Sequence, residues 1–145
     1  MIHSLRFTCV LDTNVIYPID IRDILFWFAS YDLFTPKWSK HIFEEWENVM
    51  ERKGISQKEI KKRVSKAQQA FPDAQVENYE SLVSALTLPD EKDRHVLAAA
   101  IKTNANVIVT NNIKDFPNEY LSSFGLTAKT ADDFLTDTID LNNNL

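Results

Sequence analysis

Thr8-Cys9-Val10-Leu11-Asp12-Thr13-Asn14 is the stretch that decides the fold of this chain. Its first four residues form a short β-prone run, which polar, turn-forming residues then cut off. A second run of this kind, Asn106-Val107-Ile108-Val109-Thr110, ends at Asn111-Asn112. Short apolar runs bounded by turn signals are typical of strands buried in a parallel sheet. We therefore expect both segments to be buried parallel strands.

Helical patterns fill most of the chain between these two runs. They fall at residues 21–30, 39–53, 56–71 and 91–104, with a weaker one at 79–86. Gly54 can end one helix, Ser56 with Glu59 forms a capping box for the next, and Pro72 ends that helix. Further strands are expected at 33–35 and 126–128, and Thr130 opens a last helix. Strands that alternate with helices predict an α/β fold with a parallel sheet.

Length and composition favour one globular domain. The chain has 145 residues, of which 44% are hydrophobic and 26% are charged, close to globular averages. We expect a single domain over residues 1–145, with a core at about 8–135 and a flexible tail at 136–145. Only two glycines, Gly54 and Gly125, are present, which argues against a glycine-rich phosphate loop.

Charge and cysteine usage restrict the partners and the compartment. The net charge of −5 means that nucleic acid must be held by a local basic patch or by a metal ion. The lone cysteine, Cys9, lies in an apolar run and indicates a buried thiol in a reducing compartment, without an internal disulfide. No signal peptide or membrane-length apolar stretch is recognisable. We therefore expect a cytoplasmic protein without a membrane segment.

Carboxylates stand where a parallel sheet would gather them. Asp12 ends the first strand, Asp115 lies just beyond a later strand, and Asp93 opens a helix within its apolar stripe. Ligands bind outside the carboxyl ends of strands in such sheets, and clustered acids need a cation. The alternative is structural: Asp12 and Asn14 would form a turn or a helix cap, and Asp93 would be a first-turn acid favoured by the helix dipole.

The helix at 39–53 contributes one further candidate acid. Of its three glutamates, only Glu45 closely flanks the apolar stripe, whereas Glu44 and Glu47 point away from it. Glu45 can therefore reach an interior cleft. The alternative is an exposed helix residue that pairs with a neighbouring cation.

Four separated motifs, taken together, resemble the PIN-domain ribonucleases. The resemblance runs from about Thr8 to Leu135, and its motifs are Asp12-Thr13-Asn14-Val15, Glu45-Trp46, Asp93-Arg94-His95-Val96-Leu97-Ala98-Ala99-Ala100 and Val109-Thr110-Asn111-Asn112-Ile113-Lys114-Asp115-Phe116. It implies an α/β/α sandwich around a short parallel sheet and endonucleolytic hydrolysis of RNA with bound Mg²⁺ or Mn²⁺. Most free-standing bacterial members of this size are toxins of VapC-like toxin–antitoxin pairs, which implies an RNA substrate, a cognate antitoxin and a homodimer.

The resemblance assigns a role to each acid. Asp12 would be the central metal ligand, Glu45 the acid of the second helix, and Asp93 the third acid, at a helix start. The usual fourth acid is replaced by Asn112, and Asp115 can supply the missing charge. Which of these two coordinates the metal stays open, and the loss of one acid favours a single tightly bound ion with a weaker second.

Other residues are expected around the acids or on the surface. Asn14 and Thr110 would position ligands or water, and Arg94 would contact RNA phosphates, whereas His95 is not a strong candidate for a general base. Core packing is favoured for the aromatic residues of the first long helix, although an exposed Trp27 or Phe28 would suit a dimer or antitoxin contact.

Two other classes of function remain to be weighed. The first is a PIN-like module that has lost catalysis and binds RNA or protein, for which Asn112 is the sequence support. The second is a phosphoryl-transfer or phosphoacceptor domain, which also places an aspartate after the first strand. Asn14 breaks the Asp-x-Asp pattern that phosphatases of the haloacid dehalogenase type require, so the second class is disfavoured.

Overall fold

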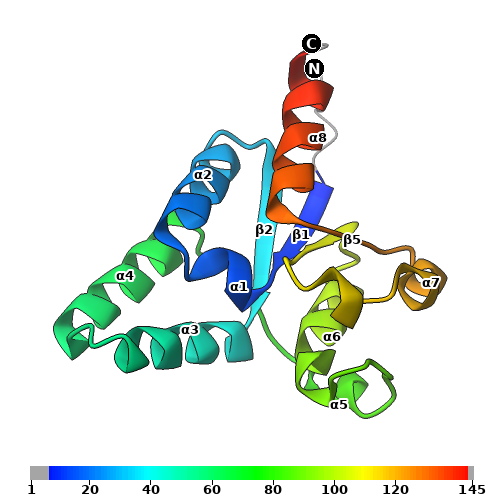
Figure 1. Cartoon of the computed structure of the whole chain (residues 1–145), viewed down its shortest axis with the longest axis horizontal. Coiled ribbons are helices and arrows are strands. Elements are labelled where there is room, and N and C mark those ends of the chain that lie inside the picture. The colour runs from blue at the N-terminus through cyan, green and yellow to red at the C-terminus, as the bar shows by residue number, and fades with distance from the viewer. Residues whose placement is uncertain (1–6, 144–145) are drawn as a thin grey trace.

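A five-stranded parallel sheet forms the centre of the fold (Figure 1). The structure is a computed structural model and describes residues 7–143. Its strands are β1 (Phe7–Leu11), β2 (Phe34–Ser39), β3 (Gln75–Val76), β4 (Val107–Val109) and β5 (Thr127–Lys129), in the spatial order β3-β2-β1-β4-β5. The chain adds strands on one side of β1 and then returns to add β4 on the other side. The carboxyl ends of β1 and β4 therefore lie at the topological switch point, where ligands bind in such sheets.

Helices cover both faces of the sheet. Successive side chains of a strand point to opposite faces, yet Cys9, Val10 and Leu11 of β1 are all fully buried. The helices are α1 (Thr13–Ile16), α2 (Ile19–Ser30), α3 (Lys40–Arg52), α4 (Gln57–Ala70), α5 (Glu80–Val83), α6 (Arg94–Lys102), α7 (Asn118–Leu121) and α8 (Ala131–Asn143), with 3₁₀ turns η1 (Glu91–Asp93), η2 (Ile113–Asp115) and η3 (Ser122–Phe124). The predicted α/β fold with a parallel sheet is confirmed.

Local capping signals placed most helix boundaries correctly. Ser56 Oγ accepts a hydrogen bond from the Glu59 N–H at 3.2 Å, and Thr130 Oγ1 accepts one from the Asp133 N–H at 3.1 Å. Gly54 adopts φ +81° just beyond α3, a backbone conformation that favours glycine. β2 is longer than predicted and runs to Ser39, which is also the N-cap of α3.

Two helices differ in extent from the sequence expectation. The predicted helix at 91–104 begins with the 3₁₀ turn η1, so Asp93 precedes α6 instead of lying within its apolar stripe. The predicted flexible tail at 136–145 is helical as far as Asn143, while residues 144–145 lie outside the described part. Phe134 explains the second difference, because its buried ring packs edge-on against Phe34 at 4.9 Å and anchors α8 to β2.

Burial accounts for the state of the single cysteine. Cys9 is fully buried in β1, and burial raises the pKa of its thiol well above the usual range. A protonated, inaccessible thiol is chemically inert. Within residues 7–143, no helix is long and apolar enough to cross a membrane.

Anchoring of α8 is testable by substitution. Phe134→Ala should destabilise the fold by about 3–5 kcal/mol, because it removes a buried ring and leaves a cavity between α8 and the sheet. Ile139→Ala is the matched control on the same helix, since Ile139 is 46% exposed and its loss should change stability by less than about 0.5 kcal/mol. Urea unfolding followed by circular dichroism measures both, and equal effects would contradict the docking of α8.

Candidate active site

Asp12 is held at the switch point by three hydrogen bonds. It is 6% exposed and caps α1, where Oδ1 accepts the Thr13 N–H at 2.8 Å. Its other oxygen, Oδ2, accepts the Thr110 hydroxyl at 2.9 Å and the Asn14 amide at 3.0 Å. Burial raises the pKa of Asp12, although the bonds from Thr110 and Thr13 oppose that rise. The structural alternative thus holds in part, because Asp12 is a helix cap as well as a candidate ligand.

Asn14 and Thr110 tie the ends of β1 and β4 together. Asn14 donates to Thr110 Oγ1 at 3.1 Å, and its Oδ1 accepts the Asn111 N–H at 2.9 Å. The same Thr110 oxygen accepts the Asn112 N–H at 3.1 Å. Each of these bonds joins residues that follow different strands or fixes the turn after β4. The two side chains therefore have the contacts needed to position Asp12.

Glu45 reaches the same region from α3. Its Oε1 accepts the Thr13 hydroxyl at 2.8 Å and lies 3.4 Å from His95 Nε2, whereas Glu44 and Glu47 are exposed, as expected. Burial by itself would raise the pKa of Glu45. The hydrogen bonds from His95 and Thr13, and the nearby imidazoles, outweigh that effect and lower the pKa. Glu45 is therefore a carboxylate at neutral pH.

Asp93 sits in the field of the other acids. It is half-buried just before α6 and makes no capping hydrogen bond. Burial is the main cause that raises its pKa to about 7, and the negative charges of Asp12, Asp90, Asp115 and Glu45 raise it further. A simple first-turn acid would be stabilised as an anion. Asp93 shows the opposite, because burial and the like charges around it both disfavour its anion.

Asp115 and Asn112 differ in their surroundings. Asp115 is half-buried at the end of η2 and contributes to the raised pKa of Asp93. Asn112 is exposed, and its backbone makes the hydrogen bonds found there: its N–H donates to Thr110 Oγ1, and its carbonyl accepts the Asp115 N–H at 3.0 Å. The electrostatic link to Asp93 favours Asp115 as the fourth acid, and that assignment stays a prediction.

The carboxylates of Asp12, Asp93 and Asp115 are chemically suited to a hard divalent cation, because carboxylate oxygens are the ligands that Mg²⁺ and Mn²⁺ prefer. Among residues 7–143, however, no three histidine, cysteine, aspartate or glutamate side chains lie close enough to form a ready metal cage. A cation would therefore have to draw the acids together, and the repulsion around Asp93 is the force it would relieve.

Sequence analysis missed the contact that supports Glu45. His95 is 9% exposed on α6, and its Nδ1 lies 2.8 Å from Ser39 Oγ, the N-cap of α3. The available signal was a histidine among the buried residues of a helix.

Arg94, which was expected to contact RNA, is half-buried, and its Nε donates a hydrogen bond to the Glu91 carbonyl at 3.2 Å. Its role with RNA stays a prediction.

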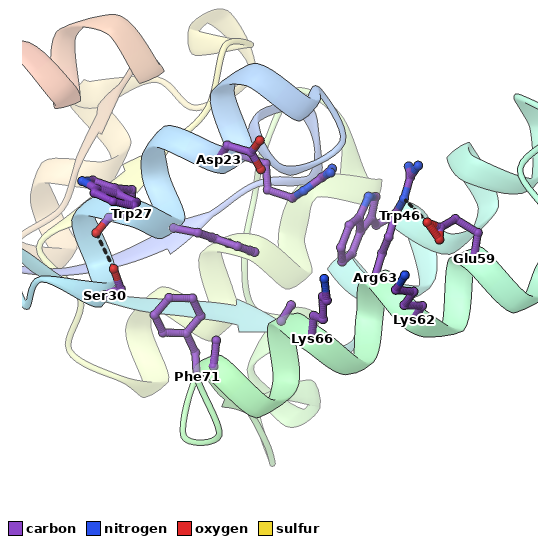
Figure 2. Close-up of a pocket in the computed structure, with 13 residues that line it drawn as sticks. Asp23, Trp27, Ser30, Trp46, Glu59, Lys62, Arg63, Lys66 and Phe71 are labelled. Carbon is purple, nitrogen blue, oxygen red and sulfur yellow. Dashed lines mark hydrogen bonds and ion pairs between the residues drawn. The ribbon is translucent and has the colours of Figure 1, made fainter.

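A separate groove lies between α2 and α4 (Figure 2). We call it the α2–α4 groove; it has a volume of about 660 Å³ and shares no lining residue with the acids described above. The prediction that Trp27 packs in the core is wrong, because its side chain lines this groove and is 63% exposed. Phe28 does pack against the core. Lys62, Arg63 and Lys66 project from α4 along the groove, which Arg22 also lines (Figure 2). Asp23 and Glu59 line it too, and Glu59 pairs with Arg63 at 3.9 Å, so the groove keeps a net positive charge on an acidic protein.

The charge on Asp93 should make stability depend on pH. Its folded pKa of about 7 exceeds the ordinary 3.8, so the folded state binds the extra proton and this group's contribution falls as pH rises from about 4 to 7. Without divalent ions, Asp93→Asn should raise the melting temperature at about pH 8, and the gain should vanish near pH 4. Differential scanning fluorimetry measures this, with Glu91→Gln, an exposed acid of the same turn, as control. A gain independent of pH would contradict the charge argument.

Comparison with known proteins agrees with the geometry. The sequence model of the PIN domain matches residues 8–114. A curated protein of Mycobacterium tuberculosis (strain ATCC 25618 / H37Rv), named "Putative ribonuclease VapC50", is 48% identical over 63 residues, which cover 43% of this chain and 37% of that protein. The chain thus matches little more than a third of its relative's length, and no solved structure gave a significant match. Because the family match covers well over half of the sequence, the chain belongs to the PIN-domain family.

Proposed function

We propose that this protein is a divalent-metal-dependent endoribonuclease and the toxin of a bacterial type II toxin–antitoxin pair. The observation that carries the proposal is the gathering of acids at the switch point, where burial first, and then the charges of Asp12, Asp90, Asp115 and Glu45, raise the pKa of Asp93 to about 7. A relative whose name describes a ribonuclease supports the same reaction class. The buried Cys9 is consistent with a reducing compartment, and we place the reaction in the cytoplasm.

The proposed metal ligands are Asp12, Asp93 and Asp115, with Mg²⁺ or Mn²⁺ as the ion. When bound, such an ion polarises the scissile phosphate and lowers the pKa of an attacking water. The protein's own contribution at Asp12 is orientation. Thr110 and Asn14 both donate to Oδ2, so that carboxylate is fixed before any ligand arrives.

Glu45 has the features of a residue that orients the attacking water. Its lowered pKa keeps it ionised, and its contacts with Thr13 and His95 both use Oε1. The other oxygen, Oε2, is then the one to accept a hydrogen bond from the attacking water. Arg94, half-buried beside Asp93, is the proposed contact for an RNA phosphate.

The α2–α4 groove is the proposed contact for the cognate antitoxin. Its lining combines the exposed ring of Trp27 with the cations Lys62, Arg63 and Lys66. Aromatic and arginine side chains are enriched where proteins bind one another, and the local charge favours a segment with acidic and apolar residues. A homodimer remains part of the proposal from family resemblance alone.

A catalytically silent PIN-like binding module is the second candidate function. Asn112 supports it, because it stands where the family's fourth acid is expected and is exposed. The two candidates differ in one measurable property, which is metal-dependent cleavage of RNA.

Cleavage of total cellular RNA by the purified protein tests this difference. With Mg²⁺ or Mn²⁺ we expect discrete products that EDTA abolishes. Asp12→Asn, Asp93→Asn and Asp115→Asn should each lower the rate about 100-fold or more, because each removes a charged oxygen ligand. Glu47→Gln, at an exposed acid on α3, should keep wild-type activity. Folded, antitoxin-free wild-type protein that cleaves no RNA under any metal condition would leave the silent module as the better explanation.

Binding to the cognate antitoxin that this proposal requires tests the groove. Trp27→Ala should weaken the affinity about 30-fold, as expected for the loss of an aromatic anchor, and Lys66→Glu should weaken it by reversing a groove charge. Ile24→Ala is the control, since Ile24 is exposed on α2 and does not line the groove. Isothermal titration calorimetry measures the affinities; unchanged binding in Trp27→Ala would remove the groove from the proposal.

A further inference from the structure

His95 connects the start of α3 to the acid that α3 carries. Its Nδ1 lies 2.8 Å from Ser39 Oγ and its Nε2 lies 3.4 Å from Glu45 Oε1. The imidazole is 9% exposed and Ser39 is fully buried, whereas the Glu45 side chain is 46% exposed, so His95 contacts Glu45 from the buried side. Resting on the proposed function, we propose that His95 is a positioning residue that holds the Glu45 carboxylate in its working orientation through Nε2–H.

The contact with Ser39 bears on which nitrogen of the His95 imidazole carries the proton. As the N-cap of α3, Ser39 Oγ accepts the Ile42 N–H at 3.1 Å. Its hydroxyl hydrogen has two neighbouring acceptors, Tyr79, with which Ser39 also shares a hydrogen bond, and His95 Nδ1; we assign it to His95. A neutral imidazole that accepts at one nitrogen carries its proton on the other. The Glu45 carboxylate, 3.4 Å from Nε2, favours the same Nε2–H form, because it can only accept a hydrogen there.

The contact between His95 and Glu45 helps to set the orientation of the Glu45 carboxylate. His95 Nε2 and Thr13 Oγ1 approach the same oxygen, Oε1. Two donors on one oxygen fix the rotation of the carboxylate and leave Oε2 for a water. Thr13 directly follows Asp12 and gives it a backbone hydrogen bond. His95 and Thr13 thus relate the position of Glu45 to that of Asp12, from α6 and α1 respectively.

Two conservative substitutions separate positioning from packing. In His95→Gln, the side-chain amide can place an N–H near the site of the imidazole Nε2. In His95→Asn, the shorter amide reaches only the site of Nδ1, so it can contact Ser39 but not Glu45. We expect His95→Asn to lower kcat about 10- to 100-fold with little change in KM, and His95→Gln to restore most of the loss. The substrate is an oligoribonucleotide that the wild-type protein cleaves.

A double-mutant cycle tests whether the effect passes through Glu45. In a Glu45→Gln background, His95→Asn should cause little further loss, because residues that act as one unit are not additive. A merely structural histidine would predict equal losses in both backgrounds and no rescue by glutamine, and either result overturns the proposal. Melting temperatures of all variants identify any that fail to fold.

The imidazole tautomer gives a readout that does not require cleavage. At about pH 8, above the ordinary imidazole pKa, ¹⁵N chemical shifts of His95 should show a proton on Nε2. A proton on Nδ1 alone overturns the proposal, because Nε2 would have nothing to donate. A wild-type protein that cleaves no RNA removes the proposed function, and the tautomer in the same sample still decides whether His95 holds Glu45.

Discussion

The hydrogen bond from Thr110 to Asp12, which joins the carboxyl ends of β1 and β4, is the interaction on which the site depends. A buried carboxylate is costly unless hydrogen bonds replace its water, and Asp12 is almost fully buried. Its backbone N–H bonds the Val109 carbonyl at 3.0 Å, so the strand ladder sets the distance that the Thr110 and Asn14 side chains then bridge. Correct pairing of β1 with β4 and correct placement of Asp12 are therefore the same requirement.

Near this fixed carboxylate, the pKa values of two other acids, Glu45 and Asp93, are shifted in opposite directions. Glu45 receives donors from Thr13 and His95, and its pKa is lowered. Asp93 makes no capping hydrogen bond, and burial with the neighbouring negative charges raises its pKa. Neighbouring acids whose pKa values differ strongly are typical of active sites in which chemically similar groups have different roles. Here the donors from Thr13 and His95 keep Glu45 charged, whereas Asp93 needs a cation or a proton to be stable in its surroundings.

The parts of this structure that sequence analysis predicted have local causes. The two apolar runs became β1 and β4, Ser56 and Thr130 capped the helices they precede, and the order of the acids sufficed to place Asp12 and Glu45 in one region. The parts it missed depend on contacts between distant segments. β3 has two residues and exists through its pairing with β2, the final turns of α8 follow from the anchoring of Phe134 on the sheet, and His95 meets Ser39 across 56 positions of sequence. None of these leaves a periodic or capping signal.

The uncharged side chain of Asn112 limits the negative charge that accumulates around Asp93. Its backbone N–H still bonds Thr110 Oγ1, so the turn after β4 keeps the bond that steadies Thr110 and, through it, Asp12. Only the side chain departs from the family pattern. Burial and the charges of Asp12, Asp90, Asp115 and Glu45 already raise the pKa of Asp93 to about 7, and a further carboxylate at 112 would raise that value and weaken the folded apoprotein at neutral pH. An uncharged residue at this position limits the repulsion, while the charge of Asp115, three residues later, still acts on Asp93.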